Sequence, residues 1–146
     1  MEKLLVVGSG TMGRGIAYVG ALGGFQVILN DVSKNNLDHD KAYIETELNR
    51  SVEKGLLTHE QVLYALENLN YTTDLESACK DVDIAIEAVF ELIEIKIEVF
   101  KKLDAFCPEH TILATNTSTM SPTEIAAQTS RPEKCLAMHF FNPVTR

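Results

Sequence analysis

Three glycines near the N-terminus, Gly8, Gly10 and Gly13, have the G-x-G-x-x-G spacing that can bring a backbone close to a phosphate group. An apolar run over 4–7 precedes them, and apolar residues at helical spacing follow. Between a strand and a helix, the first glycine permits a tight turn, the second lets the backbone approach a pyrophosphate, and the third permits close packing. Unpaired N–H groups at the helix N-terminus add to this site. We therefore expect a dinucleotide site, rather than a turn that serves packing alone, made by Gly8, Ser9, Gly10, Thr11, Met12 and Gly13.

An acidic residue, Asp31, stands eighteen residues after Gly13, at the end of the second predicted strand. At this place in a dinucleotide fold, a carboxylate accepts hydrogen bonds from the adenosine ribose and repels a ribose 2′-phosphate. Asp31 therefore favours NAD over NADP as the cofactor. An aspartate that only caps the turn after the strand is the alternative for this residue.

A histidine and a serine follow the last two predicted strands. His139 is near the end of the strand predicted over 135–141, where alternation directs it either into helix packing or into a cleft at the strand ends. In the cleft, its imidazole could take a proton from a hydroxyl group during hydride transfer. Ser118 follows the strand predicted over 111–115, and binding a substrate oxygen and serving as a turn serine are equal alternatives for it.

Two glutamates lie close to the strand predicted over 83–89. A pair of acids can do acid–base chemistry, but for Glu87 we favour the simpler role of stabilising the N-terminus of the next helix. Lysines such as Lys96 on that helix are typical of a solvated face. His39, His59 and His110 do not have the spacing of metal ligands, so we expect no metal site.

The whole chain alternates between strand and helix patterns. Apolar runs predict strands over 4–7, 25–29, 83–89, 111–115 and 135–141. Helical spacing and caps predict helices from Met12 to Gly23, from Ser33 to Gly55, from Thr58 to Leu69, from Leu92 to Leu103, and from Ser121. This order predicts an α/β fold: a doubly wound, mostly parallel Rossmann sheet with helices on both faces and ligands at the carboxyl ends of the strands.

Length and composition exclude several classes of protein. With 146 residues, 45% of them apolar, the chain suits one domain with its own core. A net charge of −8 without a basic patch argues against nucleic acid as a partner, and no run reaches the roughly 18 to 20 apolar residues that span a membrane. Three widely spaced cysteines and the absence of a signal-peptide pattern predict a cytoplasmic protein with free thiols.

With these residues identified, the chain resembles the 3-hydroxyacyl-CoA dehydrogenase family, and in particular its bacterial members that act on 3-hydroxybutyryl-CoA. Four motifs carry the resemblance and together span nearly the whole chain. They are Gly8 to Ala17, Ile86 to Glu91, Asn116-Thr117-Ser118, and His139-Phe140-Phe141-Asn142-Pro143. The glycine motif is shared with many dehydrogenases, whereas the last motif is specific.

The resemblance implies roles for individual residues. His139 would be the catalytic base that deprotonates the 3-hydroxyl group while hydride leaves C3 for the nicotinamide. Ser118 would bind the substrate oxygen and the nicotinamide side of NAD. Glu91, Lys96 and Asn142 would contact the nicotinamide ribose. Lys54 matches, more loosely, a lysine that touches coenzyme A in the family.

The resemblance also implies what lies outside residues 1–146, which correspond to the NAD-binding domain alone. The family continues with a glutamate that orients the histidine and with a helical domain for dimerisation and substrate binding, and this chain stops at Arg146. We therefore expect the full-length enzyme to be a homodimer and this chain alone to be a poor catalyst. Thr145, where many relatives have a second proline, is a minor departure.

The implied function is that of an NAD-dependent oxidoreductase that interconverts (S)-3-hydroxyacyl-CoA and 3-oxoacyl-CoA, in fatty-acid oxidation or butyrate-type metabolism. Two alternatives stay open at this point. The domain could be a dinucleotide-binding module without turnover. It could also belong to a related β-hydroxyacid dehydrogenase, which would use a lysine as its base instead of His139.

Overall fold

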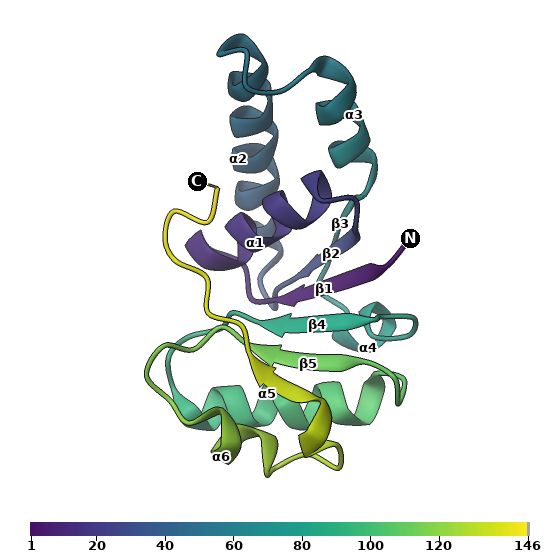
Figure 1. The fold of residues 1–146 in the computed structure, drawn as a ribbon, viewed down its shortest axis with the longest axis vertical. Helices are drawn as coiled ribbons and strands as arrows, with labels where there is room; N and C mark the ends of the chain where they lie inside the picture. Colours follow the sequence, from purple (N-terminus) through teal and green to yellow (C-terminus); the bar gives the residue numbers. More distant parts are fainter. Residues whose placement is uncertain (146) are drawn as a thin grey trace.

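The computed structural model describes residues 1–145 and contains one six-stranded sheet in which every pair of neighbouring strands is parallel (Figure 1). Its strands are β1 (Lys3–Val7), β2 (Gln26–Asn30), β3 (Leu69–Thr72), β4 (Ile84–Glu87), β5 (Ile112–Thr115) and β6 (Cys135–Ala137). Their order is β3-β2-β1-β4-β5-β6, so the winding reverses between β1 and β4. This topology confirms the predicted doubly wound α/β fold, and the reversal is the place where such sheets bind ligands.

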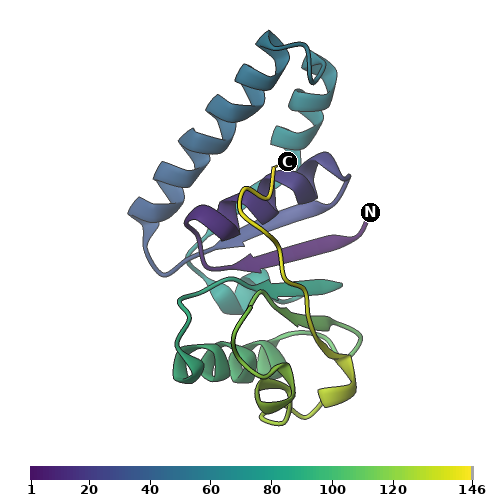
Figure 2. The same ribbon diagram turned by 60° about the vertical axis from the view of Figure 1, so that its left-hand side comes forward.

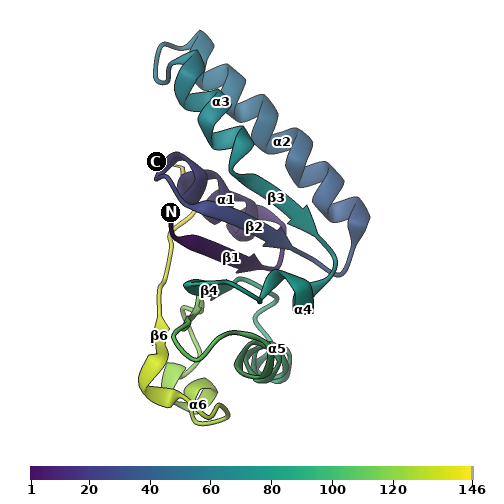
Figure 3. The same ribbon diagram turned by 90° about the vertical axis from the view of Figure 1, so that its right-hand side faces the viewer.

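Helices cover both faces of the sheet, as predicted. They are α1 (Thr11–Leu22), α2 (Lys34–Glu53), α3 (His59–Glu67), α4 (Leu75–Ala78), α5 (Ile93–Phe106) and α6 (Pro122–Ala126), with a 3₁₀ turn at Pro132–Lys134. Helices α1, α2 and α3 pack on one face, and α4, α5 and α6 pack on the other. Figures 1 and 3 show that α2 and α3 form a pair that extends away from the sheet beyond β3.

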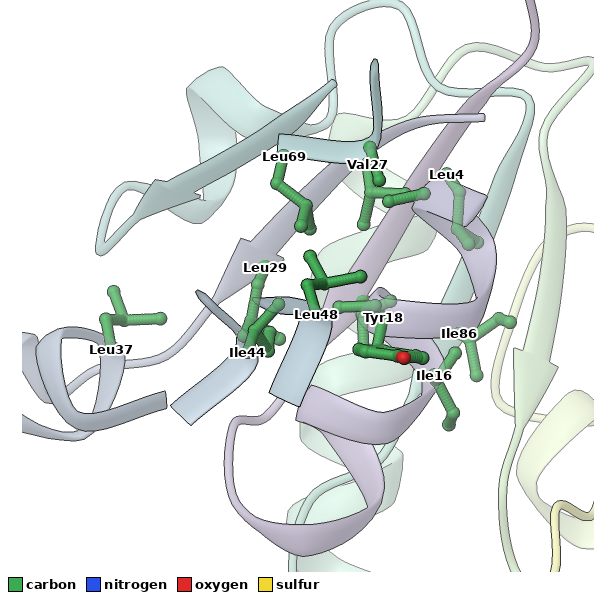
Figure 4. Packing of buried hydrophobic residues seen from close by; sticks show 14 of the residues in the cluster. Leu4, Ile16, Tyr18, Val27, Leu29, Leu37, Ile44, Leu48, Leu69 and Ile86 are labelled. Atoms are coloured by element: carbon green, nitrogen blue, oxygen red, sulfur yellow. The ribbon is translucent and has the colours of Figure 1, made fainter. Parts of the chain in front are cut away.

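Alternation along β1 explains why the sheet has two cores. Leu4 and Val6 point to the face of α1, whereas Leu5 and Val7 point to the face of α5, and all four side chains are buried. A strand that is buried on both faces needs apolar residues at every position, which is the pattern of β1 from Leu4 to Val7. Figure 4 shows the first core, where side chains of α1 and α2 pack over those of β2.

Caps fix several helix starts where the sequence predicts them. The side chain of Ser33 accepts a hydrogen bond from the N–H of Asn36 at the start of α2. Thr58 and Gln61 form a full capping box at α3, and Ser121 caps α6, whose first residue is Pro122. These caps satisfy N–H groups that have no partner within their own helices.

The segment after α3 differs from the prediction. The predicted helix to Leu69 ends at Glu67, and Leu69 begins β3, an edge strand that was not predicted. The short helix α4 was not predicted either. Four residues at an edge, two of them only half-buried, give too short an apolar pattern to separate a strand from a helix end.

The last strand is also shorter than predicted. β6 ends at Ala137 rather than at residue 141, because it is an edge strand and its only neighbour, β5, ends at Thr115. The following segment leaves the sheet and crosses toward α1, as Figure 2 shows in yellow. There Val144 packs against Gly15, where a methyl group would come within 3.0 Å of it.

Replacing Leu48 by Ala tests the packing of α2 on this scaffold. Leu48 has no exposed surface, so its loss should lower the free energy of unfolding by about 2–5 kcal/mol. Leu56→Ala is the control, because Leu56 is 72% exposed and its truncation should cost less than about 0.5 kcal/mol. Chemical denaturation measures both values, and equal losses would contradict the packing of α2.

Candidate dinucleotide and active site

A cleft of about 1100 Å³ lies at the carboxyl ends of the strands, where the winding reverses. Ten of the residues predicted to bind cofactor or substrate line it: Gly8, Ser9, Gly10, Thr11, Met12, Asp31, Glu91, Ser118, His139 and Asn142. Gly13, Lys54 and Lys96 are not on its walls. The cleft is large enough for a dinucleotide and much larger than a single small substrate needs.

The glycine motif has the conformation that its sequence predicts. Gly8 and Gly10 have φ values of 99° and 102°, in the region that favours glycine. At Gly13 a methyl group would overlap the carbonyl oxygen of Gly8, so α1 starts as close to β1 as a backbone can. At Gly10 nothing lies within 4 Å of the place where a methyl group would be, which leaves the backbone open toward a ligand.

The N–H groups of this loop divide into two sets. Those of Ser9 and Gly10 donate to carboxylates, at 2.9 Å to Asp31 and at 2.6 Å to Asp40. Those of residues 11–13, at the start of α1, have no acceptor within the part of the chain that the structure describes. Three unpaired N–H groups at a helix N-terminus, beside an open backbone, fit the pyrophosphate of a dinucleotide.

The carboxylate of Asp31 is held rigidly behind the loop. It accepts the hydroxyl of Ser9 at 2.8 Å as well as the N–H groups of Ser9 and Ser33. Burial alone would raise the pKa of Asp31, but hydrogen bonds from Ser33, Ser9 and Asn36 outweigh it, so the pKa lies below its usual value. Asp31 is therefore ionised at neutral pH and able to accept hydroxyl hydrogen bonds.

A buried ion cluster supports the middle of the cleft. The ammonium of Lys96 lies 2.7 Å from Glu87 and 3.0 Å from Glu91, and neither Lys96 nor Glu87 has exposed side-chain surface. The other oxygen of Glu87 accepts the hydroxyl of Thr115 at 2.7 Å, and its first oxygen also accepts the N–H of Val89. The cluster therefore joins β4, β5 and α5.

The simple roles expected for two of these residues were wrong. Glu87 is the last residue of β4 and pairs with a buried lysine, so it does not act as a charge at a helix N-terminus. Lys96 is not on a solvated face, because its ammonium is buried and contacts two carboxylates instead of water. A single acidic residue within the otherwise apolar run over 84–89, with an opposite charge nine residues later, is the signal that could have indicated this pair.

Glu91 connects the buried cluster to the cleft. Its second oxygen accepts hydroxyl groups from Thr117 at 2.8 Å and from Thr119 at 3.2 Å. Burial raises the pKa of Glu91, but Lys96 and Thr117 lower it by more, so the group is ionised at neutral pH. Glu91 thus holds the loop after β5 that carries Ser118.

His139 and Ser118 reach the same cleft from two loops. His139 lies beyond the end of β6, not within a strand as predicted, so strand alternation does not set its direction. Its ring is exposed and packs at a tilt on Phe141, with ring centroids 4.6 Å apart. The side-chain oxygen of Asn116 accepts the N–H of Phe140 at 2.8 Å and so ties the two loops together.

The remaining predicted residues lie away from this centre. Lys54 is exposed at the C-cap of α2, at the opposite end of that 20-residue helix from the cap Ser33. In residues 1–145, no group of three or more His, Cys, Asp or Glu side chains is arranged to hold a metal ion. No helix within the same residues has the length and apolar character needed to cross a membrane.

Sequence reasoning also missed Asp40, the acceptor of the Gly10 N–H. The buried residues of α2 are Leu37, Asp40, Ile44 and Leu48, so an aspartate occupies a position of the apolar stripe. An acidic residue in this apolar stripe could have been noticed in the sequence, because a buried acid needs a specific partner. Its partners, however, are a backbone N–H and Arg14, which are thirty and twenty-six residues away.

The reversed parallel sheet, the open glycine loop and the cleft together define a dinucleotide-binding domain of the dehydrogenase type. A family model described as "3-hydroxyacyl-CoA dehydrogenase, NAD binding domain" matches residues 3–146. The chain belongs to this family, and NAD is the cofactor of the domain.

Individual relatives agree with this assignment. A 3-hydroxybutyryl-CoA dehydrogenase of Clostridioides difficile is 46% identical over 142 residues, which are 97% of this chain and 50% of that protein. A probable 3-hydroxybutyryl-CoA dehydrogenase of Bacillus subtilis is 42% identical over 144 residues, 99% of this chain and 50% of that protein. A crystal structure of the Escherichia coli 3-hydroxybutyryl-CoA dehydrogenase superposes with a TM-score of 0.94 at 42% identity, covering 98% of this chain and 30% of that one. The chain thus spans about half the length of the curated relatives it matches.

Replacing Lys96 by Met tests the buried ion cluster. The substitution leaves Glu87 buried beside Glu91 without a positive charge, so unfolding free energy should fall by about 3–5 kcal/mol. Lys101→Met, on an exposed position of the same helix, should change it by less than about 0.5 kcal/mol. The double variant Lys96→Met with Glu87→Gln should recover part of the loss in a urea titration, and no recovery would argue against the pairing.

Proposed function

We propose that this chain is the cofactor half of an NAD-dependent oxidoreductase that interconverts (S)-3-hydroxyacyl-CoA and 3-oxoacyl-CoA. The observation that carries the proposal is one cleft lined both by the glycine loop with Asp31 and by His139 with Ser118. Relatives named 3-hydroxybutyryl-CoA dehydrogenase, at 42% and 46% identity, support this substrate class. Fatty-acid oxidation or butyrate-type metabolism is the corresponding context.

The dinucleotide end of the cleft would bind NAD through the backbone. The N–H groups of residues 11–13 would donate hydrogen bonds to the pyrophosphate. The carboxylate of Asp31 would accept hydrogen bonds from the hydroxyl groups of the adenosine ribose. Glu91 and Asn142 would contact the nicotinamide ribose. Lys96 was expected to contact this ribose directly, but its side chain has no exposed surface and pairs with Glu91, so it would act through that carboxylate.

The chemistry would take place between Ser118 and His139. Bound NAD supplies the acceptor for the hydride that leaves C3 of the substrate. The imidazole of His139 would take the proton of the 3-hydroxyl group, and would return one in the reverse reduction. Ser118, exposed on the same cleft, would hold the substrate oxygen by a hydrogen bond.

The relatives are about twice as long, and we propose that this greater length contributes to the acyl-CoA site and to a homodimer. Lys54, at the far end of α2, would then touch coenzyme A outside the cleft. A carboxylate beside His139 would also come from beyond residue 146. A cytoplasmic location completes the proposal, supported by free thiols at Cys79, Cys107 and Cys135.

Replacing Asp31 by Ser tests the assignment of the adenosine end. The variant loses a carboxylate that accepts ribose hydroxyls, so NADH should bind at least tenfold more weakly and NADPH should lose less. Calorimetric titration of residues 1–146 with each nucleotide measures this. Because the pKa of Asp31 is lowered, its charge persists at every pH above its usual value of 3.8, so its contribution to NADH binding should not change between pH 6 and pH 8. Equal losses for both nucleotides would refute the role.

Replacing His139 by Gln tests the proton transfer. Residues 1–146 joined to the remaining half of the Clostridioides difficile relative should oxidise NADH with acetoacetyl-CoA, and His139→Gln should lower kcat at least a hundredfold. NADH binding should stay within about twofold, because glutamine is similar in size and the residue lies away from the glycine loop. Retained turnover in the variant would favour a lysine base, and a folded wild-type chimaera without turnover would favour a binding module.

A further inference from the structure

Asp40 is a buried carboxylate beside the glycine loop. The proposed chemistry does not use this carboxylate. Its side chain is 3% exposed and is not on the wall of the cleft. One oxygen accepts the N–H of Gly10 at 2.6 Å, and the other lies 3.4 Å from the guanidinium of Arg14 and 3.2 Å from Nδ1 of His39. A ligand in the cleft therefore cannot reach this carboxylate to form a hydrogen bond with it.

The place of Asp40 sets it apart from Asp31. Both carboxylates hold an N–H group of the glycine loop, but Asp31 lines the cleft and can accept hydroxyl groups of a ligand. Asp40 makes no contact with a bound ligand, so it can act on one through its charge or through the position of the Gly10 N–H that it holds. The unpaired N–H groups of residues 11–13 begin one residue after Gly10, whose own N–H lies 2.6 Å from Asp40, so an anion on them would lie within about 10 Å of this carboxylate. At that distance, beneath a protein surface, salt screens a charge only weakly.

Arg14 balances part of this charge. Its guanidinium lies beside Asp40 and over the ring of Tyr43, 3.8 Å from the ring centroid, and its side chain is 19% exposed. Arg14 is in the first turn of α1, so its positive charge is near the same three N–H groups. The site thus contains a fixed pair of opposite charges directly behind the place of the pyrophosphate.

We propose that the negative charge of Asp40 limits the affinity of the site for the dinucleotide pyrophosphate. The positive charge of Arg14 then determines how large this loss of affinity is. This inference rests on the proposed function, because it assumes a dinucleotide on the glycine loop. A negative charge that makes no contact with the ligand repels the pyrophosphate without a compensating hydrogen bond.

Replacing Asp40 by Asn separates charge from loop geometry. Asparagine keeps an oxygen that can accept the N–H of Gly10, but it removes the negative charge and leaves Arg14 uncompensated. Calorimetric titration of residues 1–146 should show NADH and ADP binding about three- to tenfold more tightly to the variant, with adenosine unchanged. Asp38→Asn is the matched control, because this exposed aspartate on the same helix loses the same charge while pairing only with Lys34.

A second variant predicts the opposite change. Arg14→Gln removes the balancing charge and should weaken NADH binding about three- to tenfold, which gives an independent result if Asp40→Asn fails to fold. The proposal is overturned if Asp40→Asn binds NADH equally or more weakly at an unchanged melting temperature, since Asp40 would then serve only to anchor Gly10. If the wild-type chain binds neither NADH nor ADP, the proposed function itself fails. If it binds NADH and neither variant shifts the affinity, only the inference about Asp40 fails.

Discussion

The absence of side chains at Gly8 and Gly13 is the constraint on which the site depends. A methyl group on Gly13 would overlap the carbonyl oxygen of Gly8, and one on Gly8 would come within 2.7 Å of the carbonyl oxygen of Ala88. These two contacts bring the start of α1, the end of β1 and the end of β4 together at the point where the winding reverses. A larger residue at either position would move the N-terminus of α1, with its unpaired N–H groups, away from the cleft.

Two groups of buried charged side chains then hold the loops that the glycines bring together. Lys96 lies between Glu87 and Glu91 on one side of the cleft, and Arg14 lies beside Asp40 on the other. Buried pairs contribute little net stability, because desolvation offsets most of their attraction. Their effect here is geometric: each pair holds a backbone N–H, that of Val89 or Gly10, in a single place. In both places a buried carboxylate therefore fixes the position of a loop backbone beside the cleft.

The sequence predicted those parts that follow from local patterns and failed where pairing across the sheet decides. The glycine loop, Asp31 and the caps at Ser33, Thr58 and Ser121 each depend on a few adjacent residues, and all lie where expected. β3 has only four residues, and this pattern is too short to distinguish a strand from a helix end. β6 ends because its neighbour β5 ends, and the residues of β6 alone do not show where β5 ends. The burial of Glu87, Lys96 and Asp40 likewise depends on partners on other elements.

The two ends of the cleft differ in how firmly the structure holds them. At the glycine loop, hydrogen bonds within the domain hold the N–H groups of Ser9 and Gly10 against the carboxylates of Asp31 and Asp40. His139 is exposed beyond the end of a strand, and its ring rests on Phe141, itself 77% exposed. Two hydrogen bonds join the loops of His139 and Ser118: the N–H of Phe140 donates to the side chain of Asn116, and the N–H of Met138 donates to the carbonyl oxygen of Thr115. Since proton transfer depends on orientation within a few tenths of an ångström, cofactor binding and catalysis have separate structural requirements. In the proposed function, the first would depend on the glycine loop, and the second on how the segment around His139 is held.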